Sequence, residues 1–242
     1  MSVRCSWPQL NKLRKDPMPE GTLHVEPDEV RALLAFSRRQ FLWDMRMPVR
    51  VVSTASAIGL YTAPPLGVLA LFAVPGTIDI PSDEPLDVTV SLSSLVSEFE
   101  SASASARDID LERLHPASVP VTSAMSVAFL PPRQGWQVPM HAVAGDLGLR
   151  VDEAVAEFTL RSAGQGEAVQ QQIADEIWER AVWAALPMRV LHAAKRLGML
   201  GNDRSRVSAA SCGSWKRFST SRGHVFIRPA PTPTRTALRL LM

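Results

Sequence analysis

The basic residues of the C-terminal quarter are the strongest chemical signal in this sequence. From Leu186 onward the chain holds eleven lysines and arginines and a single acid, Asp203, which gives a formal charge of +10. Because the whole chain carries +2, the remainder carries −8. Guanidinium and ammonium groups bind phosphates and carboxylates. The charge pattern therefore indicates a surface for an anionic ligand.

The spacing of these residues suggests how such a surface could be built. Arg189, His192 and Arg196 recur at i, i+3 and i+7, which places them on one face of a helix. A β-hairpin expected further along the chain adds more cations, one of them at its turn. The candidate residues for binding nucleic acid or another anion are Arg189, His192, Arg196, Lys216, Arg217 and Arg222.

Other interpretations of the charge remain open. The acidic N-terminal part could pack against the basic part, so that each neutralises the other, or both could contact a protein partner or a second copy. Arginine supplies 22 of the 26 basic residues. A GC-rich genome produces this bias without any function, so the arginine content alone does not indicate binding.

Enzyme motifs are absent. The chain holds no Gly-x-Ser-x-Gly elbow, phosphate-binding loop or dinucleotide fingerprint. Cys212 and His224 could form a nucleophile and its base across a hairpin, but a turn with a buried thiol is the commoner arrangement. Histidines and cysteines do not fall at ligand spacing, so we expect no metal and no cofactor. An enzyme whose site is assembled from residues distant in sequence stays an alternative.

The first hundred residues predict a small sheet with packed helices. Pro27 followed by two acids is typical of a helix start, and apolar residues at helical spacing continue it to about Trp43. Short runs rich in β-branched residues follow, which predicts strands near 49–52, 58–62, 67–74 and 86–92. A serine-capped helix is expected near 93–99.

The second half predicts helices followed by a hairpin. Apolar stripes predict helices near 151–158, 169–181 and 187–198, and strands are expected near 206–210, 215–220 and 224–228. This order is similar to that of a winged-helix DNA-binding domain over about Val151 to Arg228. The Pro-rich turn ending at Trp136 either presents that ring to solvent or uses it to cover the core, and the second interpretation is favoured.

The expected fold class is α+β, with a small N-terminal sheet and packed helices, then a helical segment closed by a basic β-hairpin. Residues 20–100 form the first predicted domain, the Ser/Ala-rich segment 101–118 a flexible connection, 119–230 the second domain and 231–242 an extended tail. A single larger domain accounts for the pattern nearly as well.

The stretch between Arg50 and Asp79 has no charged residue, but it is interrupted by Pro64 and Pro65. Buried strands therefore explain it better than a membrane span. No secretory segment is recognised at the start of the chain, and the two cysteines lie far apart in sequence. We expect a cytoplasmic protein with both thiols reduced.

Two segments carry a family resemblance, Leu130-Pro-Pro-Arg-Gln-Gly-Trp136 and the stretch from Gly213 to Arg228. Both resemble segments of uncharacterised proteins from actinobacteria with GC-rich genomes. The resemblance covers the second half and implies no activity, cofactor or site. The function expected from the residues is a non-catalytic binding or regulatory protein that uses its basic C-terminal surface on nucleic acid or another anion. A protein-interaction module and an enzyme are the alternatives.

Overall fold

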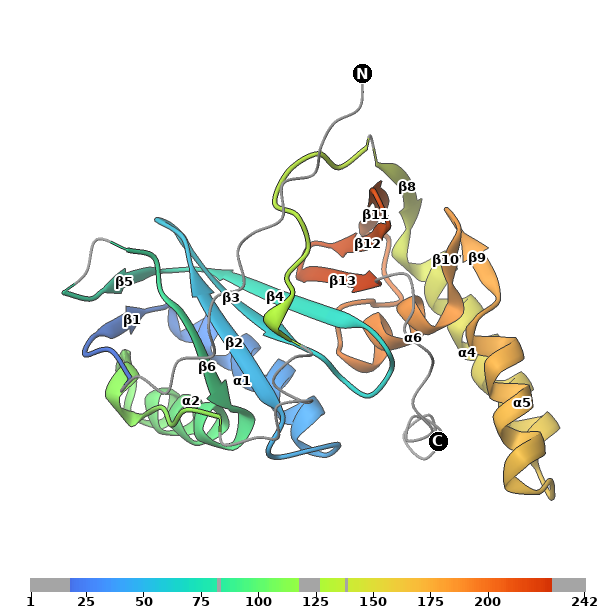
Figure 1. The fold of residues 1–242 in the computed structure, drawn as a ribbon, viewed down its shortest axis with the longest axis horizontal. Helices are drawn as coiled ribbons and strands as arrows, with labels where there is room; N and C mark the ends of the chain where they lie inside the picture. The colour runs from blue at the N-terminus through green and yellow to red at the C-terminus, as the bar shows by residue number, and fades with distance from the viewer. Residues whose placement is uncertain (1–17, 82–83, 118–126, 138, 228–242) are drawn as a thin grey trace. The chain divides into compact units, whose positions relative to one another are not determined.

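The computed structural model describes residues 18–81, 84–117, 127–137 and 139–227 (Figure 1). Within these residues the chain divides into two compact units. The N-terminal unit consists of the described residues in 18–64 and 69–130, and the C-terminal unit of those in 65–68 and 131–227. Both units combine helices with antiparallel strands, which confirms the α+β class.

The N-terminal unit is built around a four-stranded antiparallel sheet. Its elements in chain order are β1 (Thr22–His24), α1 (Pro27–Phe41), β2 (Pro48–Ser53), β3 (Ala57–Thr62), β4 (Leu69–Pro75), β5 (Thr77–Asp79), β6 (Asp87–Ser91), α2 (Leu92–Ser105), β7 (Ile109–Asp110) and the 3-10 helix η1 (Leu111–Arg113). The larger sheet has the order β6-β2-β3-β4, and a smaller one has the order β5-β1-β7. Figure 1 shows α1 and α2 side by side on one face of the larger sheet.

The first helix follows from local signals. Pro27 begins α1, where its missing N–H costs no hydrogen bond, and Asp28 and Glu29 lie at the positive end of the helix dipole. Phe36 is buried and stacks on Phe72 of β4, with ring centroids 4.8 Å apart. The sequence-based end of this helix lay within two residues of its observed end at Phe41.

The segment 101–118 differs from the flexible connection that its composition predicts. Its first residues are the last turns of α2, and β7 and η1 follow. Ala102 is buried, and the Ser101 hydroxyl accepts a hydrogen bond of 2.9 Å from Arg107 Nη2. A Ser/Ala repeat has little periodicity of its own, but its small side chains let the helix pack closely. Tertiary packing therefore continues the helix beyond the expected end.

The C-terminal unit contains a second four-stranded antiparallel sheet with helices. Its elements are β8 (Met140–Val143), α4 (Ala144–Ser162), α5 (Glu167–Trp178), β9 (Ala181–Trp183), β10 (Leu186–Pro187), α6 (Met188–Arg196), β11 (Arg206–Cys212), β12 (Trp215–Thr220) and β13 (Gly223–Ile227). The sheet has the order β13-β12-β11-β8, and β9 pairs with β10. The three strands expected near the end of the chain are confirmed, including the hairpin of β12 and β13.

The winged-helix order of elements is not the observed arrangement. The strand β8 precedes the helices and pairs with β11, and the β9–β10 ladder lies between α5 and α6. The hairpin is therefore one half of a four-stranded sheet and not a separate wing. Its alternating pattern explains this, because Phe218 and Val225 point to the same face and are fully buried.

Two further expectations concern the C-terminal tail and the uncharged stretch of the N-terminal half. The predicted tail 231–242 lies outside the described residues. The uncharged stretch between Arg50 and Asp79 forms strands β2 to β5. In the described part of the chain no helix has the length and apolar character needed to cross a membrane.

Candidate anion-binding surface

The candidate binding residues are positioned by α6 and by the hairpin of β12 and β13. The structure divides them between different places. Arg189 lies near the start of α6 and Lys216 near the start of β12. His192 is buried inside the unit, and Arg217 lies on the outer face of the sheet. Arg196 is at the end of α6, and Arg222 is at the hairpin turn. The six side chains therefore do not form one continuous surface.

Arg189 and Lys216 lie near the start of α6, and both have partners within the unit. Arg189 forms an ion pair with Glu179, the residue that follows α5. The Lys216 ammonium donates a hydrogen bond of 2.5 Å to the carbonyl oxygen of Ala185, in the turn between β9 and β10. Arg189 is therefore neutralised by an acid of its own unit, and Lys216 is held by a backbone carbonyl.

His192 faces the interior of the unit. Its side chain is 2% exposed, and its ring centroid lies 4.6 Å from that of Trp178 in α5. Burial, together with the charges of Arg196 and Lys195, lowers the pKa of His192 to about 4. The ring is therefore neutral at neutral pH. The i, i+3, i+7 spacing does not reveal this burial, because the apolar face of α6 is broad enough to include position 192.

Arg217 lies on the outer face of the sheet, which carries Trp215, Arg217 and Phe226 and is opposite the face that bears Phe218. Its guanidinium lies over the ring of Trp136, 4.4 Å from the ring centroid. Desolvation lowers the pKa of Arg217 from its usual value. Among the described residues its buried Nε has no hydrogen-bond partner.

Three exposed arginines lie at the other end of the sheet. Ser208 of β11 pairs with Ser219 of β12, so Arg206, two residues earlier, comes level with the turn that carries Arg222. Arg204 precedes β11 by two residues. We call Arg204, Arg206 and Arg222 the arginine end, and all three are exposed.

One acid, Asp203, lies beside the arginine end. Its carboxylate accepts hydrogen bonds from the hydroxyl and the backbone N–H of Ser205, at 2.5 and 3.1 Å. These bonds lower the pKa of Asp203, and the charge of Arg222 lowers it further, which places Arg222 near that carboxylate. The first N–H groups of α4 do not cradle an anion here, because Ala144 and Gly145 donate to the carbonyls of Ser205 and Asp203.

Arg196 is the last residue of α6 and is exposed. The preceding Lys195 reaches Asn202 at 3.5 Å, so the end of α6 lies against the loop that leads to the arginine end. Of the residues chosen from the sequence, Arg196 and Arg222 are thus in this region. Arg204 and Arg206 were not chosen, and the pairing of β11 with β12 is the signal that would have pointed to Arg206.

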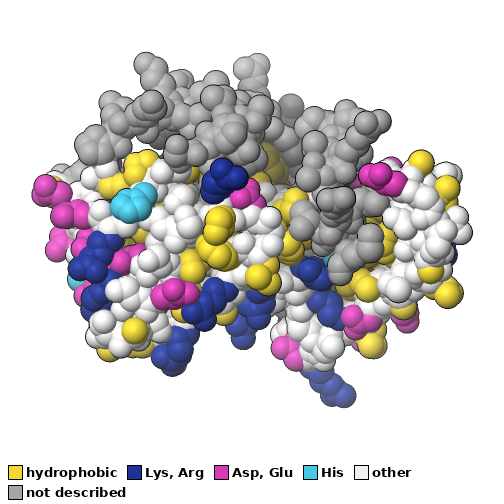
Figure 2. Space-filling view, turned by 90° about the horizontal axis from the view of Figure 1, so that it is seen from below, with side chains coloured by type: hydrophobic (Ala, Val, Ile, Leu, Met, Phe, Trp, Pro, Cys, Tyr) yellow, Lys and Arg dark blue, Asp and Glu magenta, His cyan; other side chains and the backbone are white. Residues whose placement is uncertain are grey.

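Two of the C-terminal cations are paired with acids of the same unit. Lys195 binds Asp152 of α4 at 2.6 Å, and Arg189 binds Glu179. The two acids lie at or next to the helices of the C-terminal unit, so in these pairs the neutralising charge does not come from the N-terminal part. Figure 2 shows lysines and arginines interleaved with acids on one face of the molecule.

Cys212 and His224 are not brought together. Cys212 is level with Trp215 at the start of β12, whereas His224 is level with Ser219 near its end. Four residues along a strand correspond to about 13 Å. The Cys212 thiol donates instead to the carbonyl oxygen of Gln134 at 3.6 Å, and His224 Nδ1 lies 2.9 Å from the Ser219 hydroxyl.

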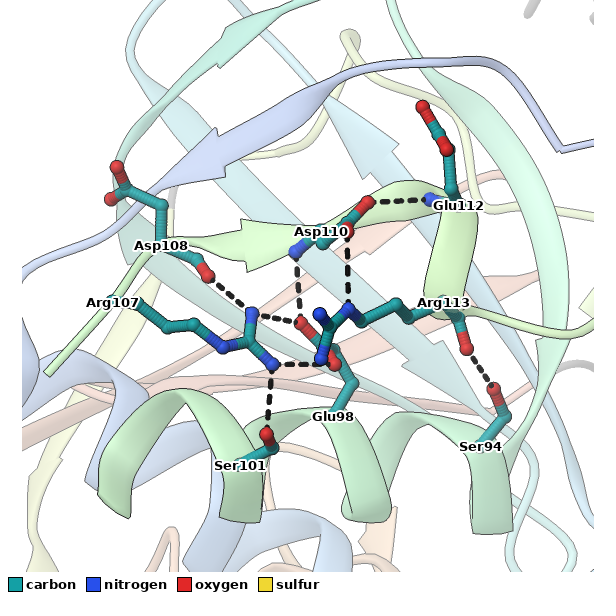
Figure 3. Close-up of polar contacts among 8 residues, drawn as sticks. All are labelled: Ser94, Glu98, Ser101, Arg107, Asp108, Asp110, Glu112 and Arg113. Carbon is teal, nitrogen blue, oxygen red and sulfur yellow. Dashed lines mark hydrogen bonds and ion pairs between the residues drawn. The ribbon is translucent and has the colours of Figure 1, made fainter. Parts of the chain in front are cut away.

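The most buried carboxylate in an ion pair belongs to the N-terminal unit (Figure 3). Glu98 of α2 is 3% exposed in its side chain and accepts hydrogen bonds of 2.6 and 3.0 Å from the Arg107 guanidinium. It also accepts a bond of 2.9 Å from the backbone N–H of Asp110. Both oxygens are thus occupied, and the cluster joins α2 to β7 rather than opening to a ligand.

Two hollows on the surface of the described residues are of interest for a site. One, of about 590 Å³, lies between α4 and β9, and the other, of about 520 Å³, lies between α1 and α2. Neither is lined by His192, His224 or Cys212. No group of three or more His, Cys, Asp and Glu side chains among the described residues is arranged to hold a metal ion.

Both halves of the chain match families described as domains of unknown function. Residues 18–118 match "Domain of unknown function (DUF8010)", and residues 131–232 match "Domain of unknown function (DUF8185)". The second match covers the half in which the sequence shows a family resemblance, and the first extends the likeness to the N-terminal half. No curated protein matches the chain significantly.

Solved structures with a similar fold are bacterial DNA polymerase sliding clamps. The β sliding clamp of Caulobacter crescentus superposes with a TM-score of 0.51 at 10% identity, over 91% of this chain and 68% of the clamp. The clamp of Pseudomonas aeruginosa gives 0.51 at 12% identity, over 91% and 67%. The chain resembles the sliding clamps in fold. It spans about two thirds of the length of these clamps.

Proposed function

We propose that this chain is a non-catalytic nucleic-acid-binding protein with a clamp-like fold, in which the arginine end contacts phosphates. The observation that carries the proposal is that Arg204, Arg206 and Arg222 are all exposed at the same end of one sheet. Asp203 supplies one negative charge beside these three positive groups, so it cannot neutralise all of them. Three exposed guanidinium groups in one place supply the contacts that a phosphate backbone needs.

The likeness to DNA polymerase sliding clamps supports the same proposal through the fold. Those proteins are described as sliding clamps, the Pseudomonas aeruginosa one as that of a DNA polymerase, and this chain shares their fold over most of its length at low identity. The likeness concerns the fold, so the residues that contact nucleic acid are proposed from this chain alone. Arg196 is exposed at the end of α6 and extends the proposed surface.

Two other functions remain as alternatives. A different anion, such as a phosphorylated small molecule, would use the same arginines but would not need an extended surface. A protein-interaction module would use acidic and basic groups together. Lys195 and Arg189 already form ion pairs with acids of the same unit, and similar pairs could form with acids of a partner protein.

The test is the binding of labelled duplex DNA and of RNA to the full chain, by fluorescence anisotropy across a salt series. We expect binding that weakens steeply from about 50 mM to about 200 mM salt, because each contacted phosphate releases counterions. The substitutions Arg204→Gln, Arg206→Gln and Arg222→Gln should each weaken binding and reduce the slope against log salt by about 1.

The matched control is Arg133→Gln. Arg133 is an exposed arginine of the same unit, in the segment that precedes β8 and away from the arginine end. It should bind as the unchanged protein does. Equal binding by all four variants would place the contacts elsewhere, and no binding at low salt would reject nucleic acid as the ligand.

A further inference from the structure

The strands β13, β12, β11 and β8 form one sheet (Figure 1), and its outer face carries a row of polar side chains. Residues directly opposite one another on neighbouring antiparallel strands point to the same face. The register gives the members of the row as His141 of β8, Ser208 of β11, Ser219 of β12 and His224 of β13. His141 is exposed and the other three are half-buried, so a dissolved ligand can reach the row.

Arg217 lies on the same face, two residues before Ser219 in β12. Among the described residues no carboxylate pairs with Arg217 and no acceptor receives a hydrogen bond from it, although its guanidinium lies over Trp136. Its Nε is buried, whereas its two terminal nitrogens still reach water. Arg50 and Arg107, which are also partly buried, each bind a carboxylate instead. Arg217 is therefore a partly desolvated cation without a counter-charge, a costly arrangement that an anion relieves.

His224 supplies a second hydrogen-bonding group beside Arg217. Its ring lies 5.8 Å from that of Phe226, and Phe226 also packs against Trp136, under the guanidinium. Burial and the charge of Arg217 lower the pKa of His224 to about 4, so the ring is neutral at neutral pH. Its Nδ1 lies 2.9 Å from the Ser219 hydroxyl. When this hydroxyl donates to Nδ1, the ring proton is on Nε2, which has no partner among the described residues and can donate to a ligand.

The surroundings of Arg217 and His224 are positive. The pKa of neither group is shifted by an acid of the described chain. On the same face the neighbouring strands add Arg206, Ser208, Ala210 and Cys212 of β11 and His141 and Val143 of β8. The segment 131–137, which carries Trp136, adds one charged residue, the exposed Arg133. This environment favours an anionic ligand.

The donors suit a phosphate monoester better than a carboxylate. A carboxylate has two oxygens in one plane, and a single guanidinium can occupy both. A phosphate monoester has three oxygens around phosphorus, which can accept from a guanidinium, an imidazole N–H and a hydroxyl on different strands. It also carries a charge of about −1.5 to −2 at neutral pH, which strengthens its attraction to an arginine.

We propose that Arg217, Ser219 and His224 form a binding site for a phosphate monoester on the outer face of this sheet. Arg217 supplies the charge and the donors of its terminal nitrogens, and His224, oriented by Ser219, supplies a further donor. The site uses none of the residues of the arginine end, so it does not depend on the proposed function. The ester belongs to a small phosphorylated molecule or to the phosphorylated end of a nucleic acid, which present the same group.

The experiment titrates the full nitrogen-labelled chain with methyl phosphate at neutral pH and constant ionic strength, followed by two-dimensional NMR. We expect saturable shifts of the Arg217 Nε–H signal and of the backbone N–H signals of Ser219 and His224. Acetate is the comparison anion. It should bind at least about tenfold more weakly, because it has two oxygens and a single charge.

Substitutions in the chain then locate the site. Arg217→Met should weaken methyl phosphate binding at least about tenfold, and His224→Phe at least about threefold, because hydrogen bonds from a charged donor are the stronger ones. Arg217→Lys keeps the charge without the planar fork and should give an intermediate loss. It also keeps the test valid if Arg217→Met does not fold, which thermal unfolding shows. The matched controls Arg133→Gln and His141→Gln change exposed residues of the same unit and should bind as the unchanged chain does.

A short DNA strand with and without a terminal phosphate identifies the source of the ester. Displacement of methyl phosphate by the phosphorylated strand alone supports the site and assigns it to a nucleic-acid end. Displacement by neither strand supports the site and assigns it to a small phosphorylated molecule. Equal displacement by both strands would show a contact with backbone phosphates and would overturn the monoester site.

Two further results overturn the proposal. Equal binding of acetate and methyl phosphate would show general attraction to positive charge, and equal binding by Arg217→Met and Arg133→Gln would place the ligand elsewhere. Arg204→Gln and Arg222→Gln should leave methyl phosphate binding unchanged. A failure of this site is therefore distinguishable from a failure of the arginine end to bind nucleic acid.

Discussion

The guanidinium of Arg217 lies over the ring of Trp136, 4.4 Å from the ring centroid. Trp136 also packs against Phe226, with centroids 5.9 Å apart, and donates its indole N–H to the carbonyl oxygen of Pro132 at 2.9 Å. The ring therefore covers the outer face of the sheet, as the favoured interpretation of the sequence expects. Arg217 in turn is held on this ring.

The first prediction separates the two members of this pair. Trp136→Leu should destabilise the fold by about 2 kcal/mol, because a large part of the cover over Phe226 is lost. Arg217→Met should change stability by less than about 1 kcal/mol, because losing the cation–π contact is offset by removing a partly desolvated charge. Urea denaturation followed by circular dichroism measures both. Equal losses would mean that the charge of Arg217, not the ring, holds this face together.

The second prediction concerns the buried His192. Its pKa is about 4 in the folded chain, against 6.5 for an unperturbed histidine, so the unfolded chain binds the proton first as pH falls. The stability of the unchanged protein should therefore be complete above about pH 6.5 and fall toward pH 4. His192→Leu should remove this contribution and gain about 2 kcal/mol relative to the unchanged protein at pH 5.

The measurement for His192 is the urea midpoint at pH 5 and at pH 7.5. His224, whose pKa burial and the charge of Arg217 lower to about 4, should keep part of the acid sensitivity in the His192→Leu variant. Substitution of the exposed His141 by Gln is the control and should change stability by less than about 0.5 kcal/mol. A pH dependence unaltered by His192→Leu would contradict the burial of this ring.

The third prediction concerns the buried ion pair of Glu98 and Arg107 (Figure 3). Glu98→Gln should cost about 2 kcal/mol, because charge-assisted bonds to Arg107 are replaced by weaker ones. Arg107→Met should cost more, about 3 kcal/mol, because the carboxylate stays buried without its cation. Chemical denaturation measures the two losses. Arg38→Gln removes an exposed ion pair with Glu100 and should cost less than about 0.5 kcal/mol.

The fourth prediction concerns Glu157, which joins α4 to Arg180 beyond α5. Hydrogen bonds from Arg180 and Arg161 lower the pKa of Glu157 to about 2, so its contribution to stability is complete above about pH 4.5 and is lost as pH falls toward 2. The groups are partly exposed, and Glu157→Gln should cost less than about 1 kcal/mol. Thermal unfolding in low and in high salt provides the measurement. A cost that does not shrink in high salt would argue against a screened, electrostatic origin.

Local structure was largely predictable from the sequence. The start of α1 follows from Pro27 and the acids after it, and the hairpin of β12 and β13 follows from alternating residues around Ser221-Arg222-Gly223. Helix-start and turn preferences depend on residues only a few positions apart, so they can be recognised from one sequence. The last turns of α2 were not predictable, because a Ser/Ala repeat has no apolar periodicity that indicates a helix. Ala102 is buried by packing within the folded unit.

The candidate site depends more strongly on tertiary structure. The sequence by itself determined that cations dominate the chain after Leu186, since charge is a property of composition. Which cations share one end of the sheet was decided by strand register, which brings Arg206 level with the turn that carries Arg222, and the burial of His192 was decided by helix packing, which places it against Trp178. Both depend on contacts between segments far apart in the chain. A spacing rule along one helix describes one face of that helix, but the neighbour that covers the face is supplied only by the folded structure.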